Sequence, residues 1–195
     1  MIRFARWGFA LVLLPLAGCG GGGEETAAAT PPPAPAPAPP PLSPADTNFI
    51  NMAAMSGIAE IQESQLASQR ASRAGVRDFA EHMASDHTQM NQQLTQLAQK
   101  NGVTLPAQPD PKAQAEMQGL EKLRGRVFER QFLRHEVADH QQAVQMFQQE
   151  AQQGSNPDVK AFAQQSLPTL QQHLDMAQSL AGGHPMMKAP PKKEM

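Results

Sequence analysis

The sequence of 195 residues contains no tyrosine, one tryptophan and one cysteine. Aromatic residues make up only 5% of the chain and runs of β-branched residues are few, so signals for β-strands are weak. The single cysteine excludes an internal disulfide and a site built from several thiolates. The chain also lacks a Gly-rich phosphate loop and a nucleophile elbow, so we do not expect classical nucleophilic catalysis. Any enzyme activity has to use a bound metal.

Basic residues are too few to suggest a nucleic acid partner. The formal net charge is -2, and it becomes about -4 when the first 18 residues, which hold two arginines, are left out. The sequence has no basic stripe that can follow a phosphate backbone, so binding to nucleic acid is not expected.

The first 18 residues have the features of a secretion signal. Arg3 and Arg6 precede a short apolar run that ends at Pro15, which is too short to span a bilayer. The following Leu16-Ala17-Gly18-Cys19 resembles the lipobox of bacterial lipoproteins. This resemblance implies cleavage before Cys19 and a lipid anchor on its sulfur, which makes the membrane the expected partner. The alternative is an ordinary secretory signal whose cleavage site happens to include a cysteine.

Such an anchor places the chain in the cell envelope, facing the periplasm. Gly20, rather than an aspartate, follows the cysteine and resembles the pattern of outer-membrane sorting. Residues 19–42 are rich in Gly, Ala and Pro, and we expect a disordered tether. Residues 183–195 are expected to form a disordered tail. The remaining residues, 43–182, are enough for one domain with one core.

Caps and helix breakers divide this domain into helices. Ala, Gln, Leu, Met and Glu are abundant, which favours helix throughout. Ser43, Asp110 and Asn156 each precede a proline and can cap a helix, whereas glycines supply the breaks. The expected helices run from Ser43 or Asp46 to about Ser72, from Gly75 to Asn101, from Pro111 to about Leu123, from about Arg126 to Gln153 and from Pro157 to Gly182.

Each long helix carries a possible metal ligand on its apolar face. At about 100° per residue, the inward faces include one carboxylate and three imidazoles. Glu136 lies one turn before His140 on the third long helix. Unpaired polar groups in a core are costly, so this pattern needs a physical reason. The candidate ligands are Glu60, His87, Glu136, His140 and His173.

The positions of these residues along the helices predict the topology. Glu60 and His87 lie equally far from the first turn, and His140 and His173 lie at similar distances from the last turn. The four side chains can lie at one height along the bundle axis only if the second and third long helices are parallel. This arrangement requires the segment 102–124 to return along the bundle. We therefore predict an all-α, ferritin-like four-helix bundle with a long, partly helical crossover between the second and third long helices.

The ligand set favours one metal ion over a di-iron centre. Di-iron bundles use Glu-x-x-His pairs, but Ala84 and Leu170 precede His87 and His173 by three residues. Imidazoles with a carboxylate suit a single Zn, Cu, Ni or Fe ion. The alternative is a structural or stress-related interaction module whose His and Glu side chains form a polar core network without metal. Face analysis places Asp86, Asp139 and His82 away from the core, and His135 and His184 are also expected to be solvated surface groups.

Several short motifs together resemble the bacterial family called domain of unknown function 4142. They are Phe79-Ala80, Met83, Asp86-His87, Gly102-Val103-x-Leu105-Pro106, Phe128-Glu129, Asp139-His140 and Leu167-Pro168-x-Leu170-x-x-His173-Leu174. The resemblance covers about Asp46 to Leu180 and implies a ferritin-like bundle, commonly behind a secretion or lipoprotein signal. Glu129 stands where the family typically has an aspartate. The family name implies no biochemical activity.

Overall fold

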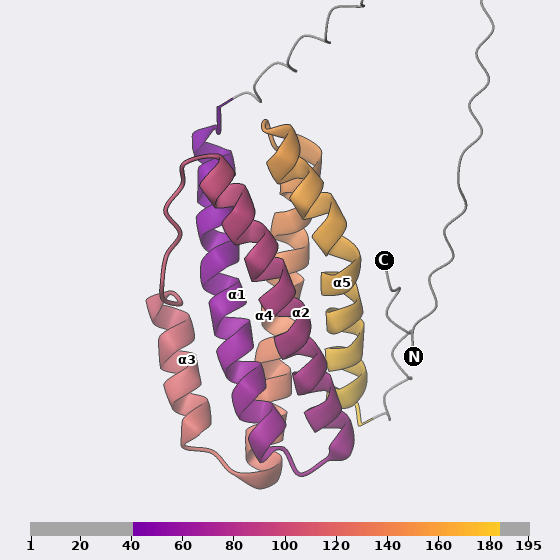
Figure 1. The fold of residues 1–195 in the computed structure, drawn as a ribbon. Coiled ribbons are helices and arrows are strands. Elements are labelled where there is room, and N and C mark those ends of the chain that lie inside the picture. The colour runs from indigo at the N-terminus through magenta and orange to yellow at the C-terminus, as the bar shows by residue number, and fades with distance from the viewer. Residues whose placement is uncertain (1–40, 184–195) are drawn as a thin grey trace, which may run out of the picture. The chain divides into compact units, whose positions relative to one another are not determined.

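The computed structural model describes residues 41–183, which form five helices and, within that range, no strand (Figure 1). The helices are α1 (Pro44–Arg70), α2 (Ala74–Lys100), α3 (Pro111–Glu121), α4 (Gly125–Gln153) and α5 (Pro157–Ala181). None of these helices combines the length and the apolar character needed to cross a bilayer. The predictions for the signal, nearly all of the tether, and the tail from His184 onward lie outside the described residues.

Three of the predicted helix starts coincide with side-chain caps, whereas α2 and α4 begin without one. The Ser43 hydroxyl accepts from the Asp46 backbone N–H at 3.1 Å, and the Asp46 carboxylate accepts from the Ser43 N–H at 2.8 Å, which is a capping box. Asp110 and Asn156 accept from the first backbone N–H groups of α3 and α5 in the same manner. A proline follows each of the three caps at the first helical position.

The helices assemble as two antiparallel hairpins joined by a crossover. Helices α1 and α2 form the first hairpin and α4 and α5 the second, and the hairpins meet through the pairs α1–α4 and α2–α5. Figure 1 shows α2 and α4 running in the same direction, with the segment through α3 returning along the outside of α1. The predicted all-α, ferritin-like bundle with its partly helical crossover is confirmed.

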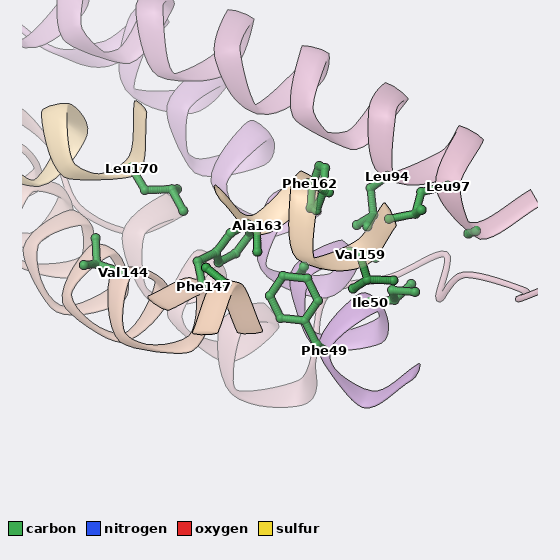
Figure 2. Packing of buried hydrophobic residues seen from close by; sticks show 14 residues of the cluster. Phe49, Ile50, Leu94, Leu97, Val144, Phe147, Val159, Phe162, Ala163 and Leu170 are labelled. Atoms are coloured by element: carbon green, nitrogen blue, oxygen red, sulfur yellow. The ribbon is translucent and has the colours of Figure 1, made fainter. Parts of the chain in front are cut away.

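A polar layer divides the hydrophobic core into two parts. The first cluster lies toward the start of α1 and includes Phe49, Leu94, Phe147 and Phe162 (Figure 2). The second cluster, at the other end of the bundle, includes Phe79, Phe128 and Phe132 together with buried parts of all four long helices. The buried polar residues of the predicted site come from positions between these clusters in each long helix.

A buried carboxylate at each end of the bundle joins the two hairpins. At one end, Glu129 of α4 accepts from the backbone N–H groups of Ser72 and Arg73, at 2.5 and 2.8 Å, and from Arg73 Nε at 2.8 Å. At the other end, Asp46 of α1 accepts from the Ser155 N–H, between α4 and α5, at 2.9 Å. These contacts set the position of one hairpin along the other, and hence the level of the polar residues between them.

Candidate metal centre

Four helices contribute to one buried polar cluster. Glu60 comes from α1, His87 from α2, Glu136 and His140 from α4, and His173 from α5. All five side chains are buried, and His173 is fully so. Gly57 of α1 permits close approach to α2 beside the cluster, because a Cβ there would lie 2.1 Å from Asn91 Oδ1. The predicted convergence of these residues in the core is confirmed.

The three histidines form a compact triangle. The ring centroids of His87, His140 and His173 are 5.3 to 5.5 Å apart, and one nitrogen of each ring lies within 4.8 Å of the others. His87 Nε2 lies 3.4 Å from His140 Nε2. Nitrogens so arranged can bind one cation together or share a proton.

Neighbouring acceptors orient two of these rings. His140 Nδ1 lies 2.9 Å from the backbone oxygen of Glu136 and therefore donates to it. His173 Nε2 lies 3.2 Å from Asp86 Oδ2, whereas its Nδ1 is buried without a hydrogen-bond partner. In a neutral imidazole only one nitrogen carries a proton, so these contacts leave lone pairs on His140 Nε2 and His173 Nδ1. Acceptors of this kind are typical of metal-binding histidines.

The two glutamates lie on the Nδ1 side of His140. Glu136 Oε2 is 3.5 Å and Glu60 Oε1 is 4.0 Å from that nitrogen. Both carboxyl oxygens of Glu136 are buried without a hydrogen-bond partner. A buried carboxylate that lacks donors is destabilised unless a proton or a cation neutralises it. A bound proton or a nearby cation would therefore stabilise the Glu60 and Glu136 pair.

Burial shifts the pKa values of both residue types toward their neutral forms. It raises the pKa of Glu60 to about 8, and burial together with the Glu60 charge raises the pKa of Glu136 well above its usual value. Burial lowers the pKa of His140 to about 3, and burial followed by the neighbouring histidines lowers that of His87. The pKa of His173 is also lowered by burial. Neutral histidines at pH 7 keep the lone pairs that a metal needs.

Two cavities adjoin the cluster and share Glu60 as a lining residue. The smaller, about 20 Å³, lies against Glu60, His87 and His140, and such a volume holds one water or ion. The larger, about 340 Å³, lies between α1, α3 and α4. Three methionines and several acidic residues line it, and its lining contains no histidine. The lining side chains include Met52, Met55, Met146, Glu63, Glu116 and Asp139.

The model of the family described as domain of unknown function (DUF4142) matches residues 31–180. The chain belongs to this family. The resemblance expected from the motifs is thereby confirmed. A comparison with curated proteins finds no match.

Solved structures show that the fold of this DUF4142 chain occurs in other proteins. A DUF305 fragment from Deinococcus radiodurans is 22% identical with a TM-score of 0.67, covering 74% of this chain and 99% of the fragment. CopM in the Cu(II)-bound form is 17% identical with a TM-score of 0.61, covering 71% and 96%. A conserved hypothetical protein from Mycobacterium tuberculosis is 15% identical with a TM-score of 0.56, covering 75% and 97%. At these identities the likeness shows a common fold.

The expected outward position of Asp86 is wrong for this DUF4142 domain. Asp86 contacts His173 of α5, and His82, one turn earlier, lies 3.2 Å from the same Asp86 oxygen. Helix α2 packs against both α1 and α5, so its covered face is wider than a single apolar stripe. The spacing of His82 and Asp86, four residues on one helix, is the sequence signal that could have identified this pair.

The expectation for His135 is also wrong, and Glu129 has a structural role. The His135 side chain is 12% exposed, and its Nδ1 lies 3.2 Å from Glu63 Oε2. The Glu63 hydrogen bond raises the pKa of His135.

Asp139 lines the larger cavity rather than contacting the histidine triangle. Glu129 joins the hairpins and does not belong to the histidine and glutamate cluster.

Proposed function

We propose that this protein binds one transition metal ion through His87, His140 and His173, with the carboxylates of Glu60 and Glu136 balancing its charge. The observation that carries the proposal is the 3.4 Å separation of His87 Nε2 and His140 Nε2. Two nitrogens that each lie about 2.0–2.1 Å from a tetrahedral metal are about 3.3–3.4 Å apart. The geometry therefore suits shared coordination, and 3.4 Å is long for a hydrogen bond between two nitrogens.

The surrounding groups support a cation at this position. Acceptors already hold His140 Nδ1 and His173 Nε2, as in metal sites whose ligand orientation is set by outer contacts. Glu60 lines the same small cavity as His87 and His140, so it is the carboxylate best placed to reach the ion. Bound metal provides the positive charge that the buried glutamates lack.

Copper(II) is the first ion to test. Imidazole ligands suit Zn, Cu, Ni and Fe, and affinity for a given site is generally highest for Cu(II) among the divalent ions of this series. The structural neighbour CopM is described in a Cu(II)-bound form, which supports the choice through a shared fold. The di-iron alternative has no support from the ligand pattern, because Ala84 and Leu170 occupy the positions where carboxylates are needed.

Elemental analysis and Cu(II) titration of the full chain test the proposal. We expect one equivalent of tightly bound metal in the wild type and the loss of this tight binding in His87→Ala and His140→Ala. His135→Ala is the matched control, because His135 is also partly buried and paired with a glutamate but lies outside the triangle. A wild type that binds no metal, together with triangle variants that are only less stable, would instead support a polar core network in a structural module.

We further propose that the protein is a lipid-anchored component of the cell envelope, held by Cys19 in the outer membrane and facing the periplasm. The lipobox-like Leu16-Ala17-Gly18-Cys19 sequence supports this location. Labelling of cells with a tagged fatty acid should give a labelled wild type and an unlabelled Cys19→Ala variant. Label that persists in the variant would contradict anchoring at Cys19.

A further inference from the structure

A second group of potential ligands shares His173 with the triangle and includes His82 and Asp86 of α2. Asp86 Oδ2 is 3.2 Å from His173 Nε2 and 3.2 Å from His82 Nε2. These three ligand atoms lie within 4.8 Å of one another. Two nitrogens and one carboxylate oxygen at this spacing form a set that suits a divalent transition metal.

This group connects the buried triangle with the surface between α2 and α5. The side chains of His82 and Asp86 are 22% and 14% exposed, whereas that of His173 is 0% exposed. His82 and Asp86 are four residues apart on α2, so both project from one face of the helix toward α5. The rings of His82 and His173 are in contact, with centroids 5.6 Å apart. A cation arriving from solvent can therefore meet His82 and Asp86 before it meets the buried ring.

We propose that His82, Asp86 and His173 form an entry site, where a divalent metal ion binds first before it moves to the buried triangle. This inference rests on the proposed metal binding by His87, His140 and His173. His173 belongs to both groups, and it is the only histidine that they share. It is the residue through which the ion passes from the outer group to the inner one.

The two nitrogens of His173 explain how one residue serves both groups. A neutral imidazole has one lone pair, so His173 binds a metal through Nε2 or through Nδ1, but not through both. Binding at the entry site uses Nε2 and leaves the proton on Nδ1. Transfer breaks the Nε2–metal bond and forms the Nδ1–metal bond, while the proton leaves Nδ1 and Nε2 regains one. No oxidation is involved, and the protein holds one ion rather than two.

The other approach to the cluster offers poorer ligands for such an ion. The cavity between α1, α3 and α4 reaches Glu60 but has no histidine in its lining. Its thioethers prefer soft monovalent copper and its carboxylates suit harder ions such as Mg²⁺ and Mn²⁺, whereas the imidazoles of His82 and His173 suit Cu(II). The observations therefore favour entry of a divalent ion through His82 and Asp86.

Stopped-flow mixing of the full chain with Cu(II), followed by absorbance, tests the entry site. We expect His82→Asn, which removes one of the three ligands of the entry site and so raises the barrier to binding, to lower the association rate constant about tenfold. If His82 lies on the path of the ion but does not hold it at equilibrium, His82→Asn should lower the dissociation rate constant by the same factor. Transfer of bound Cu(II) to a chelator measures this constant. His135→Asn is the matched control and should load at the wild-type rate. Ala59→Trp, which fills part of the larger cavity, should also leave loading unchanged.

Each outcome separates the two proposals. If the wild type binds no Cu(II), the metal-binding proposal fails, and the entry site fails with it. If the wild type binds Cu(II) but His82→Asn loads and releases it at wild-type rates, only the entry site is wrong. If His82→Asn weakens equilibrium affinity without slowing association, His82 only positions Asp86. If Ala59→Trp alone slows loading, the ion enters through the larger cavity instead.

A second measurement captures the entry site directly. In His140→Gln the triangle loses a ligand, and Cu(II) should bind more weakly, through His82, Asp86 and His173. Electron paramagnetic resonance should then show mixed nitrogen and oxygen ligation, and the further change His82→Asn should abolish it. Persistence of the same spectrum after His82→Asn would contradict the assignment.

Discussion

Hydrogen-bond donors distinguish the roles of the buried acidic residues. Burial alone would raise the pKa of Glu129, but hydrogen bonds from Arg73 and Ser72 outweigh burial and lower it. Glu60 and Glu136 lack comparable donors, and burial raises the pKa values of both. A buried carboxylate that accepts several hydrogen bonds stays ionised and holds the donor segments in place. A buried carboxylate without donors is stabilised by a cation or a proton instead. The candidate metal centre contains the second kind.

The raised pKa of Glu60 predicts a pH-dependent stability of the metal-free protein. A group whose pKa is higher in the folded state stabilises the fold below its unfolded pKa, and this contribution is lost as pH rises through the folded value. For Glu60 the window extends from about 4.5 to about 8. Glu60→Gln should therefore flatten the decline and stabilise the metal-free protein at pH 8.5, by on the order of 2 kcal/mol.

Urea unfolding in the presence of a chelator, at pH 5.5 and pH 8.5, measures this effect. The benefit of Glu60→Gln should be larger at pH 8.5 than at pH 5.5. A variant that loses the same stability at both pH values would show that Glu60 is ionised and well solvated in the folded state.

At the scale of helices, the joints between hairpins determine where the polar residues meet. Glu129 accepts three hydrogen bonds from the turn between α1 and α2, and Asp46 accepts two from the turn between α4 and α5. Both carboxylates have lowered pKa values, and that of Asp46 is about 2 because hydrogen bonds, mainly with Ser43, outweigh its burial. Both joints therefore remain ionised and intact at neutral pH.

Loss of the Glu129 joint should destabilise the whole bundle. Glu129→Ala leaves two backbone N–H groups and the Arg73 guanidinium without their acceptor, and we expect a loss of about 2–4 kcal/mol in unfolding free energy. The control is Glu116→Ala, which removes an exposed ion pair with Lys112 and should change stability by about 0.5 kcal/mol or less. Chemical unfolding compares them, and equal losses would show that Glu129 contributes no more than a surface pair.

For the molecule as a whole, the proposed ion connects both hairpins between two apolar clusters. Its ligands come from α2 in the first hairpin and from α4 and α5 in the second. An ion bound there must be lost when the bundle unfolds, so binding and folding are coupled.

Metal binding should therefore raise the thermal stability. At a free Cu(II) concentration of 100 times Kd, the added stability is about 2.7 kcal/mol, provided the unfolded chain binds little metal. Circular dichroism at 222 nm with increasing Cu(II) measures the shift in Tm. His173→Ala should show no such shift, whereas His135→Ala should keep it. An equal shift in both variants would indicate nonspecific binding.

Local signals predicted the helices and most of the candidate site. Ser43, Asp110 and Asn156 cap their helices through neighbouring backbone N–H groups, so their effect is readable over a few residues. The inward position of His87 followed from helix periodicity. The contacts of Asp86 and His82 did not, because a period of 3.6 residues identifies one apolar stripe but does not show that a second helix covers the adjacent face.

The sequence by itself determined the helices, their approximate boundaries and the inward position of five polar residues, because caps, breakers and periodicity act within one helix. The levels of those residues along their helices also predicted the parallel course of α2 and α4. Only the tertiary structure decided which nitrogen of His140 and which of His173 contacts an outer acceptor, and that His173 belongs to two groups of ligands. Those features depend on the rotation of each helix against its neighbours, which is set by packing between residues distant in the chain.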